Sequence, residues 1–270
     1  KHSDVSSIAL RDSDGTQFNL AISGPGQAQL NPVTGGYSLT VIGSDASTRI
    51  NLNNASGGDG KISLVDIDIQ GSLASLNAAS AIISGTANFN NIIELVVGES
   101  TATATIQAES IGQLSVINNA GGQWRINNTA AIPNAVADIK IGGTLYGKWQ
   151  INGGVSSITA GATDIKWQAN VRGSLTKITT HANASGLLAA ASLGDVTVGG
   201  SITHMGILVG VDLGSDQAIG GIGDAEDHFI PGTLSSLHIT GDIVSSYIAA
   251  SVNHVNGVYD DGDDLMLGGV

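Results

Sequence analysis

The sequence predicts an all-β protein, and within that class a parallel β-solenoid (β-helix) with coils of about 19 residues and an antiparallel, β-rich N-terminal cap. Three observations lead to this fold class. A short apolar pattern recurs at nearly constant spacing, and no stretch sustains the 3.6-residue period of a helix. The 270 residues are 41% hydrophobic but only 4% aromatic, with 38 glycines and 4 prolines, a composition typical of many short strands joined by tight turns.

The first 70 residues differ from the rest and are predicted to form the cap (1–70). Four segments alternate between apolar and polar residues like antiparallel strands, at 8–10, 18–22, 37–41 and 49–52. Hairpin turns are expected at 12–15 and 32–36 between them. A cap of this kind protects the first coil, because an open sheet edge invites pairing with other chains. Ile67 and Ile69 in the following strand are expected to face inward, together with Val65.

The solenoid is predicted to fill 71–270 and is defined by the pattern apolar, two residues, apolar, one residue, apolar or small. The pattern begins at Leu73, Ile92, Ile111, Val136, Val155, Leu175, Leu193 and Leu234. Most successive starts lie about 19 residues apart, and the longer last interval is interpreted as two steps that contain an insertion. Each coil is expected to hold two or three strands of about four residues, with corner glycines at positive φ. An ordinary β-sandwich is the alternative fold.

Three tryptophans, Trp124, Trp149 and Trp167, occupy similar places in consecutive repeats, which predicts that they stack. An isoleucine or alanine lies two residues after each tryptophan, on the same side of the strand, so the indoles are expected to face the core. Exposed indoles would instead offer a platform for sugar rings. The asparagines three residues after the tryptophans are expected to form an outward ladder, from Asn127 and Asn152 to Asn170.

Two acidic loops interrupt the repeat, at 212–231 and 253–266, and hold nine of the 23 acidic residues. The loops are predicted to lie near each other, because the strands before them align with one common offset, which matches Ile202 with Ile243 and Ile207 with Ile248. Carboxylates crowded in glycine-rich loops suit Ca²⁺, although a solvated acidic surface is the simpler alternative. The expected ligands are Asp212, Asp216, Asp224, Asp227, Asp260, Asp261, Asp263 and Asp264.

Composition and motifs also bear on function. A net charge of −13 disfavours nucleic-acid binding, and the lack of cysteine excludes disulfides and thiol chemistry. No apolar run is long enough to span a membrane. The six histidines show no metalloprotease spacing, and no nucleophile-elbow or P-loop motif occurs. We therefore expect a protein that is not an enzyme and has no catalytic or cofactor-binding residues. A polysaccharide lyase or glycosidase on a β-helix is the enzymatic alternative.

The segments 40–50, 57–60 and 71–76, together with the acidic ending at 246–264, resemble units of very long exported bacterial β-strand repeat proteins. The resemblance covers most of the chain and implies a cell-surface or extracellular location and structural or adhesive work. The last residues, 267–270, resemble the middle of a motif, so a mature segment or a piece of a longer polypeptide is expected. Self-association, head to tail or into a fibre or surface layer, is the expected partnership, or contact with a neighbouring surface protein. The alternatives are a carbohydrate-binding β-helix, with a polysaccharide as partner, and a viral-type receptor-binding spike.

Overall fold

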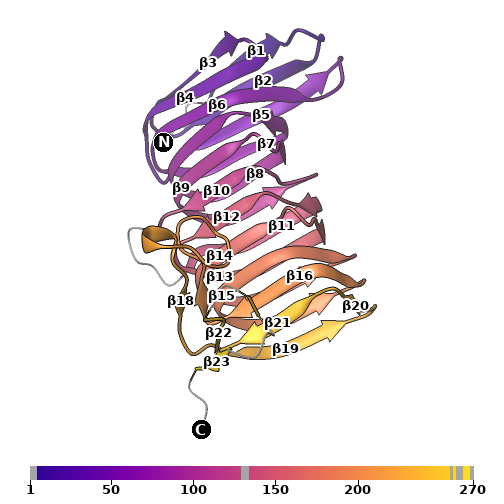
Figure 1. Cartoon of the computed structure of the whole chain (residues 1–270). Helices are drawn as coiled ribbons and strands as arrows, with labels where there is room; N and C mark the ends of the chain where they lie inside the picture. Colours follow the sequence, from indigo (N-terminus) through magenta and orange to yellow (C-terminus); the bar gives the residue numbers. More distant parts are fainter. Residues whose placement is uncertain (1–4, 129–133, 256–257, 260–263, 268–270) are drawn as a thin grey trace. The chain divides into compact units, whose positions relative to one another are not determined.

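The computed structural model describes residues 5–128, 134–255, 258–259 and 264–267, and in these residues the protein is all-β. Strands β1 to β23 account for nearly all the regular structure, and one short 3₁₀ turn, η1 (Gly223–Ala225), lies in the first acidic loop (Figure 1). Among the described residues, no helix has the length and apolar character that crossing a membrane requires. Close contacts divide the chain into two compact units, the first of 1–130 with 139–143 and the second of 131–138 with 144–270.

Unit 1 begins with antiparallel pairs and continues with parallel ones. The antiparallel pairs are β1–β2, β3–β4 and β2–β5, with turns at the two predicted places. From β4 onward the pairs are parallel, from β4–β6 and β5–β7 to β8–β9 and β9–β10. The strands are β1 (Val5–Arg11), β2 (Gln17–Ser23), β3 (Gln27–Val33), β4 (Gly36–Ser44), β5 (Arg49–Ser56), β6 (Ile62–Gly71), β7 (Leu73–Ile83), β8 (Thr86–Ser100), β9 (Thr105–Val116) and β10 (Gln123–Ile126). β11 (Asn134–Leu145) contributes residues to both units.

Unit 2 continues the parallel pairing, and Figure 1 shows β14, β15 and β16 side by side. Its main strands are β12 (Lys148–Ile151), β13 (Gly154–Thr163), β14 (Gln168–Thr180), β15 (Ala184–Val198), β16 (Ile202–Val209), β19 (Leu234–Ile239), β20 (Ile243–Val244) and β21 (Tyr247–Ala250). Two small antiparallel pairs stand apart from this sheet. They join β17 (Val211–Asp212) to β18 (His228–Phe229) and β22 (Val252–Asn253) to β23 (Leu265–Met266).

The parallel register follows the predicted repeat. Leu76 pairs with Leu95 and Leu95 with Leu114, so each leucine meets its equivalent one repeat further along the chain. These three leucines are at most 1% exposed, so successive strands form one apolar column. Burial of each such side chain stabilises the fold by about 1.5–3 kcal/mol relative to an exposed one. Six parallel strands form a closed, barrel-like set, to which many further strands are added.

The long interval before Leu234 is a single step, which corrects the interpretation as two. In β15, Leu193 pairs directly with Leu234 of β19, so no intervening coil separates them. The extra residues form the loop between β17 and β18. The strands are also longer than the predicted four residues, because one strand bends and pairs along both of its halves. β15, for example, pairs with β16 through 184–190 and with β19 through 193–198.

Two smaller expectations need correction. The corner glycines at 98, 142, 199 and 241 do not have positive φ; a Cβ there would instead meet a neighbouring strand or turn. At Gly142 it would lie 2.0 Å from the carbonyl oxygen of Ile117. Val65 is only partly buried, whereas Ile67 and Ile69 are buried as expected. The register with β4 shifts at Val65, so this residue is out of step with the alternation.

Candidate functional site

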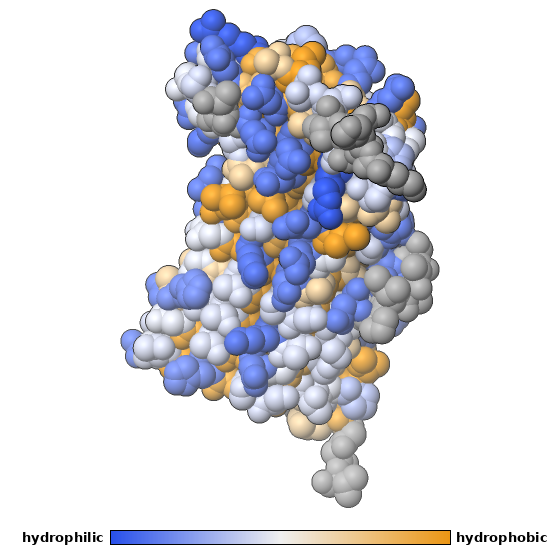
Figure 2. Space-filling view, turned by 180° about the vertical axis from the view of Figure 1, so that it is seen from behind, coloured by the Kyte–Doolittle hydropathy of each residue, from blue (hydrophilic) through white to orange (hydrophobic). Residues whose placement is uncertain are grey.

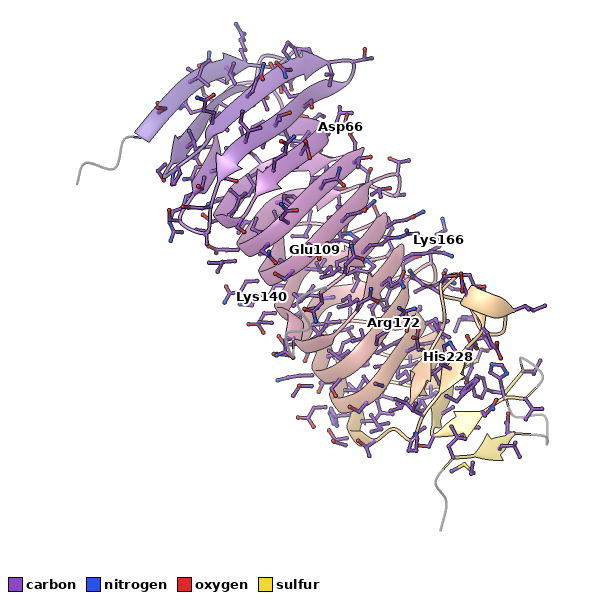
Figure 3. The ribbon with its side chains drawn as sticks, turned by 90° about the vertical axis from the view of Figure 1, so that its left-hand side faces the viewer. Asp66, Glu109, Lys140, Lys166, Arg172 and His228 are labelled. Atoms are coloured by element: carbon purple, nitrogen blue, oxygen red, sulfur yellow. The ribbon has the colours of Figure 1, made fainter. Side chains whose placement is uncertain are left out.

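The first acidic loop is anchored to the sheet of unit 2 through Asp212. One carboxylate oxygen of Asp212 accepts hydrogen bonds from the Asn170 side chain at 2.7 Å and from the Gly214 backbone N–H at 3.2 Å. The other oxygen forms an ion pair with Arg172 at 2.9 Å. Figure 3 labels Arg172 and His228 on the side of unit 2 that carries this loop. Asp212 therefore already has three donors around it and fixes the point where the loop leaves the sheet.

Other predicted ligands shape the loop itself. The Asp216 carboxylate accepts a hydrogen bond from the Ala218 backbone N–H at 3.0 Å, which closes an Asx turn. The ammonium group of Lys148 donates to the backbone oxygen of Asp216 at 3.0 Å. Asp224 lies in η1, and its backbone oxygen accepts from the N–H of Ser215. The side chains of Asp216 and Asp224 are both exposed.

Asp227 differs from these residues because its carboxylate is buried, with a side chain only 1% exposed. Its Oδ2 accepts the backbone N–H of Gly220 at 2.8 Å and lies 2.9 Å from Nε2 of His254. Its Oδ1 is buried and has no hydrogen-bond partner. Burial raises the pKa of Asp227, the Gly220 hydrogen bond and His254 oppose this, and the charge of Asp216 raises it further.

Aromatic rings enclose the imidazole of His254. Phe229 and Tyr259 meet it edge to face, with ring centroids 5.0 and 5.1 Å away. Tyr259 also stacks on Tyr247 at 5.6 Å. Burial raises the pKa of Tyr259, and the negative charges of Asp227 and Asp264 contribute in the same direction. The phenol is therefore neutral at physiological pH and supplies an uncharged wall beside the buried pair.

The Asp227–His254 pair borders a cavity of about 490 Å³. The walls combine the acidic side chains of Glu226 and Asp227 with the apolar side chains of Phe229, Val255 and Leu265. The backbone at Gly220 and Gly221, together with Asn253, completes the described lining. Because one side of the cavity comes from the first loop and the other from the second, the two loops meet here. A small molecule with one hydrogen-bonding end and one apolar end matches such walls.

The predicted proximity of the two acidic loops is confirmed. The common offset appears in the pairs Ile202 with Ile243 and Ile207 with Ile248, and Asp227 then contacts His254 across the loops. Of the predicted ligands, Asp260, Asp261 and Asp263 lie outside the described residues. Within the part of the chain that the structure describes, no three His, Asp or Glu side chains converge as a metal site would require.

His254 is the residue of this candidate site that the sequence did not predict. His254 is 27 residues from its acidic partner, a separation that matches no motif of fixed spacing. The predicted alignment of the loops places Asn253 opposite Asp212, which brings the neighbouring His254 close to the first acidic loop but does not identify Asp227 as its partner.

The tryptophans are buried as expected, with exposures of 0%, 2% and 0% at Trp124, Trp149 and Trp167. A sugar-binding platform of exposed indoles is therefore wrong. The expected stacking of Trp149 on Trp167 is also wrong, because Trp149 pairs with Ala169, two positions beyond Trp167. The asparagine ladder is lost with it, since Asn170 pairs with Gln150 and is fully buried.

Comparisons with protein-family models, with curated proteins and with solved structures gave no match to this chain.

Proposed function

We propose that this chain is a structural or adhesive β-solenoid module that works outside the cell or at its surface and associates with further copies of itself. The solenoid is supported by the parallel register, which repeats at intervals of about 19 residues in both units. It is also supported by the apolar columns that these intervals align. The antiparallel strands β1–β5 serve as the N-terminal cap of the first coil, and the regular body serves as a scaffold.

The observation that carries self-association is the unpaired edge formed by β19, β20 and β21. Among the described residues, β19 pairs only with β15, and β20 and β21 pair only with β16. Ile243 and Ile248 on this edge are 54% and 37% exposed, whereas their partners one coil earlier are fully buried. Another strand on this edge would complete the ladder and bury the isoleucines, each worth about 1.5–3 kcal/mol when fully covered.

The apolar side chains elsewhere on the surface are more scattered. Figure 2 shows one face on which apolar patches alternate with polar side chains. Isolated exposed isoleucines of this kind are common in soluble proteins and need no partner. Repeated contacts between different surfaces of identical copies build open filaments, which is the form we propose for the assembly.

Sedimentation velocity across a range of concentrations tests the proposal. The wild type should associate, and Ile243→Lys with Ile248→Lys should keep the chain monomeric, because the charges must stay hydrated. Ile165→Lys is the matched control, since Ile165 is 59% exposed in the turn between β13 and β14. A wild type that stays monomeric up to about 1 mM, where even an association worth about 4 kcal/mol would be visible, contradicts the proposal.

Calcium is a separate part of this proposal, and it concerns the outer carboxylates of the two loops. Asp216 and Asp224 are exposed on the first loop, and Asp264 is a partly buried carboxylate of the second. Oxygen ligands on glycine-rich loops suit Ca²⁺. The melting temperature should rise in millimolar Ca²⁺ and not in millimolar Mg²⁺, since Mg²⁺ demands a stricter geometry. An unchanged melting temperature in Ca²⁺ would remove calcium from the proposal.

A further inference from the structure

We propose that the cavity between the two acidic loops binds a primary ammonium group on a short apolar chain, with Asp227 Oδ1 as the acceptor. This site is distinct from the scaffold function proposed above and does not depend on self-association. The ammonium could belong to a free alkylamine or to a lysine side chain of another protein, and the shared chemistry is what the cavity recognises.

The first argument is the hydrogen-bond balance of Asp227. Its Oδ2 has two polar neighbours, the Gly220 N–H and His254 Nε2, whereas its Oδ1 has none and is buried. Buried polar atoms in folded proteins almost always have a partner, because removing them from water without one is unfavourable. Asp227 lines the cavity, so a donor that enters it and displaces the atoms that now cover Oδ1 can complete the coordination of this carboxylate. A carboxylate oxygen accepts only, so the missing partner must be a donor or a cation.

The second argument is charge. Glu226 lines the same cavity, and the negative charge of Asp216 adds a small contribution to the raised pKa of Asp227, which burial mainly causes. In a chain with a net charge of −13, these neighbours make the cavity favourable for a cation. A neutral hydroxyl would satisfy the hydrogen bond but would gain nothing from the negative charge of Glu226 beside it.

The third argument is the apolar part of the lining, which distinguishes an organic cation from a metal ion. Phe229, Val255 and Leu265 can cover a short alkyl chain, and the Phe229 ring adds attraction for a cation near its face. Calcium needs six to eight oxygen ligands, and among the described residues no three acidic or histidine side chains converge. The volume of about 490 Å³ suits a small organic molecule.

Titration of the full chain with n-butylamine, followed through the NMR signals of His254, tests the proposal, with n-butanol as the uncharged control. Butylamine should give a saturable shift and butanol none. Asp227→Asn should weaken butylamine binding at least tenfold. Asp224→Asn is the matched control, because it removes the same charge from an exposed position of the same loop and should bind as the wild type does.

Two further arms identify the source of the ammonium and guard against misfolding. A parallel titration with Nα-acetyl-lysine amide supports a lysine side chain if it binds more tightly than butylamine, and a free amine if it binds more weakly. Leu265→Trp leaves Asp227 intact and fills the cavity from an exposed position, so it should also weaken binding even if Asp227→Asn does not fold.

Three results would overturn the proposal. One is the absence of a saturable shift with both amines, and another is unchanged binding by Asp227→Asn. The third is a Tb³⁺ or Ca²⁺ ion that binds at Asp227 and that neither amine displaces, which would assign the cavity to a metal. All of these results are independent of the sedimentation experiment, so failure here leaves the scaffold proposal standing.

Discussion

Replacement of Gly194 by alanine tests the close approach of successive strands in unit 2. Gly194 lies in β15 between two paired residues, Leu193 and Asp195, whose partners in β14 are Leu175 and Lys177. A Cβ at Gly194 would lie 2.0 Å from the carbonyl oxygen of Thr176, much closer than carbon and oxygen normally approach. The φ of Gly194 lies outside the left-handed region, so the cost comes from this contact and not from backbone strain.

The expected loss of stability is about 2 kcal/mol, from three contributions. Forcing an extra carbon into a packed site costs about 1–3 kcal/mol. Separating the strands weakens at least one ladder hydrogen bond, worth about 1 kcal/mol. Alanine lowers the conformational entropy of the unfolded chain relative to glycine, which offsets about 0.4–1 kcal/mol of the loss. For a chain of this size, each kcal/mol lowers the melting temperature by about 2–4 °C, so a decrease of about 4–8 °C is expected.

Thermal unfolding followed by circular dichroism, together with urea titration, measures this effect. Ser235→Ala is the matched control, because Ser235 occupies the same place in β19 and loses an atom, so its effect should stay within about 0.5 kcal/mol. A Gly194→Ala variant that melts within about 1 °C of the wild type would refute the close-approach argument, since the net loss would be under about 0.5 kcal/mol instead of about 2 kcal/mol.

Three further predictions concern the core and the loops. Trp149→Ala should destabilise the fold by about 3–5 kcal/mol in a urea titration, because the indole is buried, with 2% exposure. A loss under about 1 kcal/mol would contradict this and would mean that the site collapses around the smaller side chain. Asp212→Ala should lower the melting temperature and speed proteolysis within 213–227. The substitution removes the Arg172 ion pair and leaves the buried Asn170 amide without its 2.7 Å acceptor, at a cost of about 1–3 kcal/mol. An unchanged cleavage rate would show that other contacts hold the loop. The pKa of Asp227 is raised in the folded chain above the ordinary aspartate value of 3.8, so above pH 3.8 the folded carboxyl keeps a proton that the unfolded chain has lost. The contribution of Asp227 to stability therefore decreases as the pH rises from 3.8 through the raised pKa. Melting curves between pH 4 and 7 should therefore show the wild type losing stability relative to Asp227→Asn, and parallel curves would contradict this assignment.

The strand ladder was predictable because it depends on local spacing. In stacked parallel strands, each apolar residue meets the equivalent residue of the next repeat, so the regular spacing of the pattern directly gives the pairs Leu76 with Leu95 and Leu175 with Leu193. Side-chain alternation then gives the buried face, which is why the burial of Trp124 and Trp149 was predicted correctly.

The register at Trp167 was not predictable from spacing alone. Trp167 precedes β14, in a turn closed by a hydrogen bond from its N–H to the Asp164 oxygen. This turn displaces the tryptophan by two positions relative to the ladder, so Ala169 takes the place opposite Trp149. A change of two positions keeps the side chain on the same face, which explains why its burial was right and its stacking was wrong.

The sequence by itself determined the all-β class, the repeating apolar register and the proximity of the two acidic loops, because these follow from side-chain alternation and from the matched offset of the strands that precede the loops. Only the tertiary structure separated the roles of the aspartates within those loops. Asp212 and Asp227 are both acidic residues on one loop, but Arg172 and Asn170 hold the first, whereas burial beside His254 isolates one oxygen of the second. The reason is physical: the environment of a carboxylate is set by residues that are distant in sequence, and a loop without a period gives no register from which to infer them.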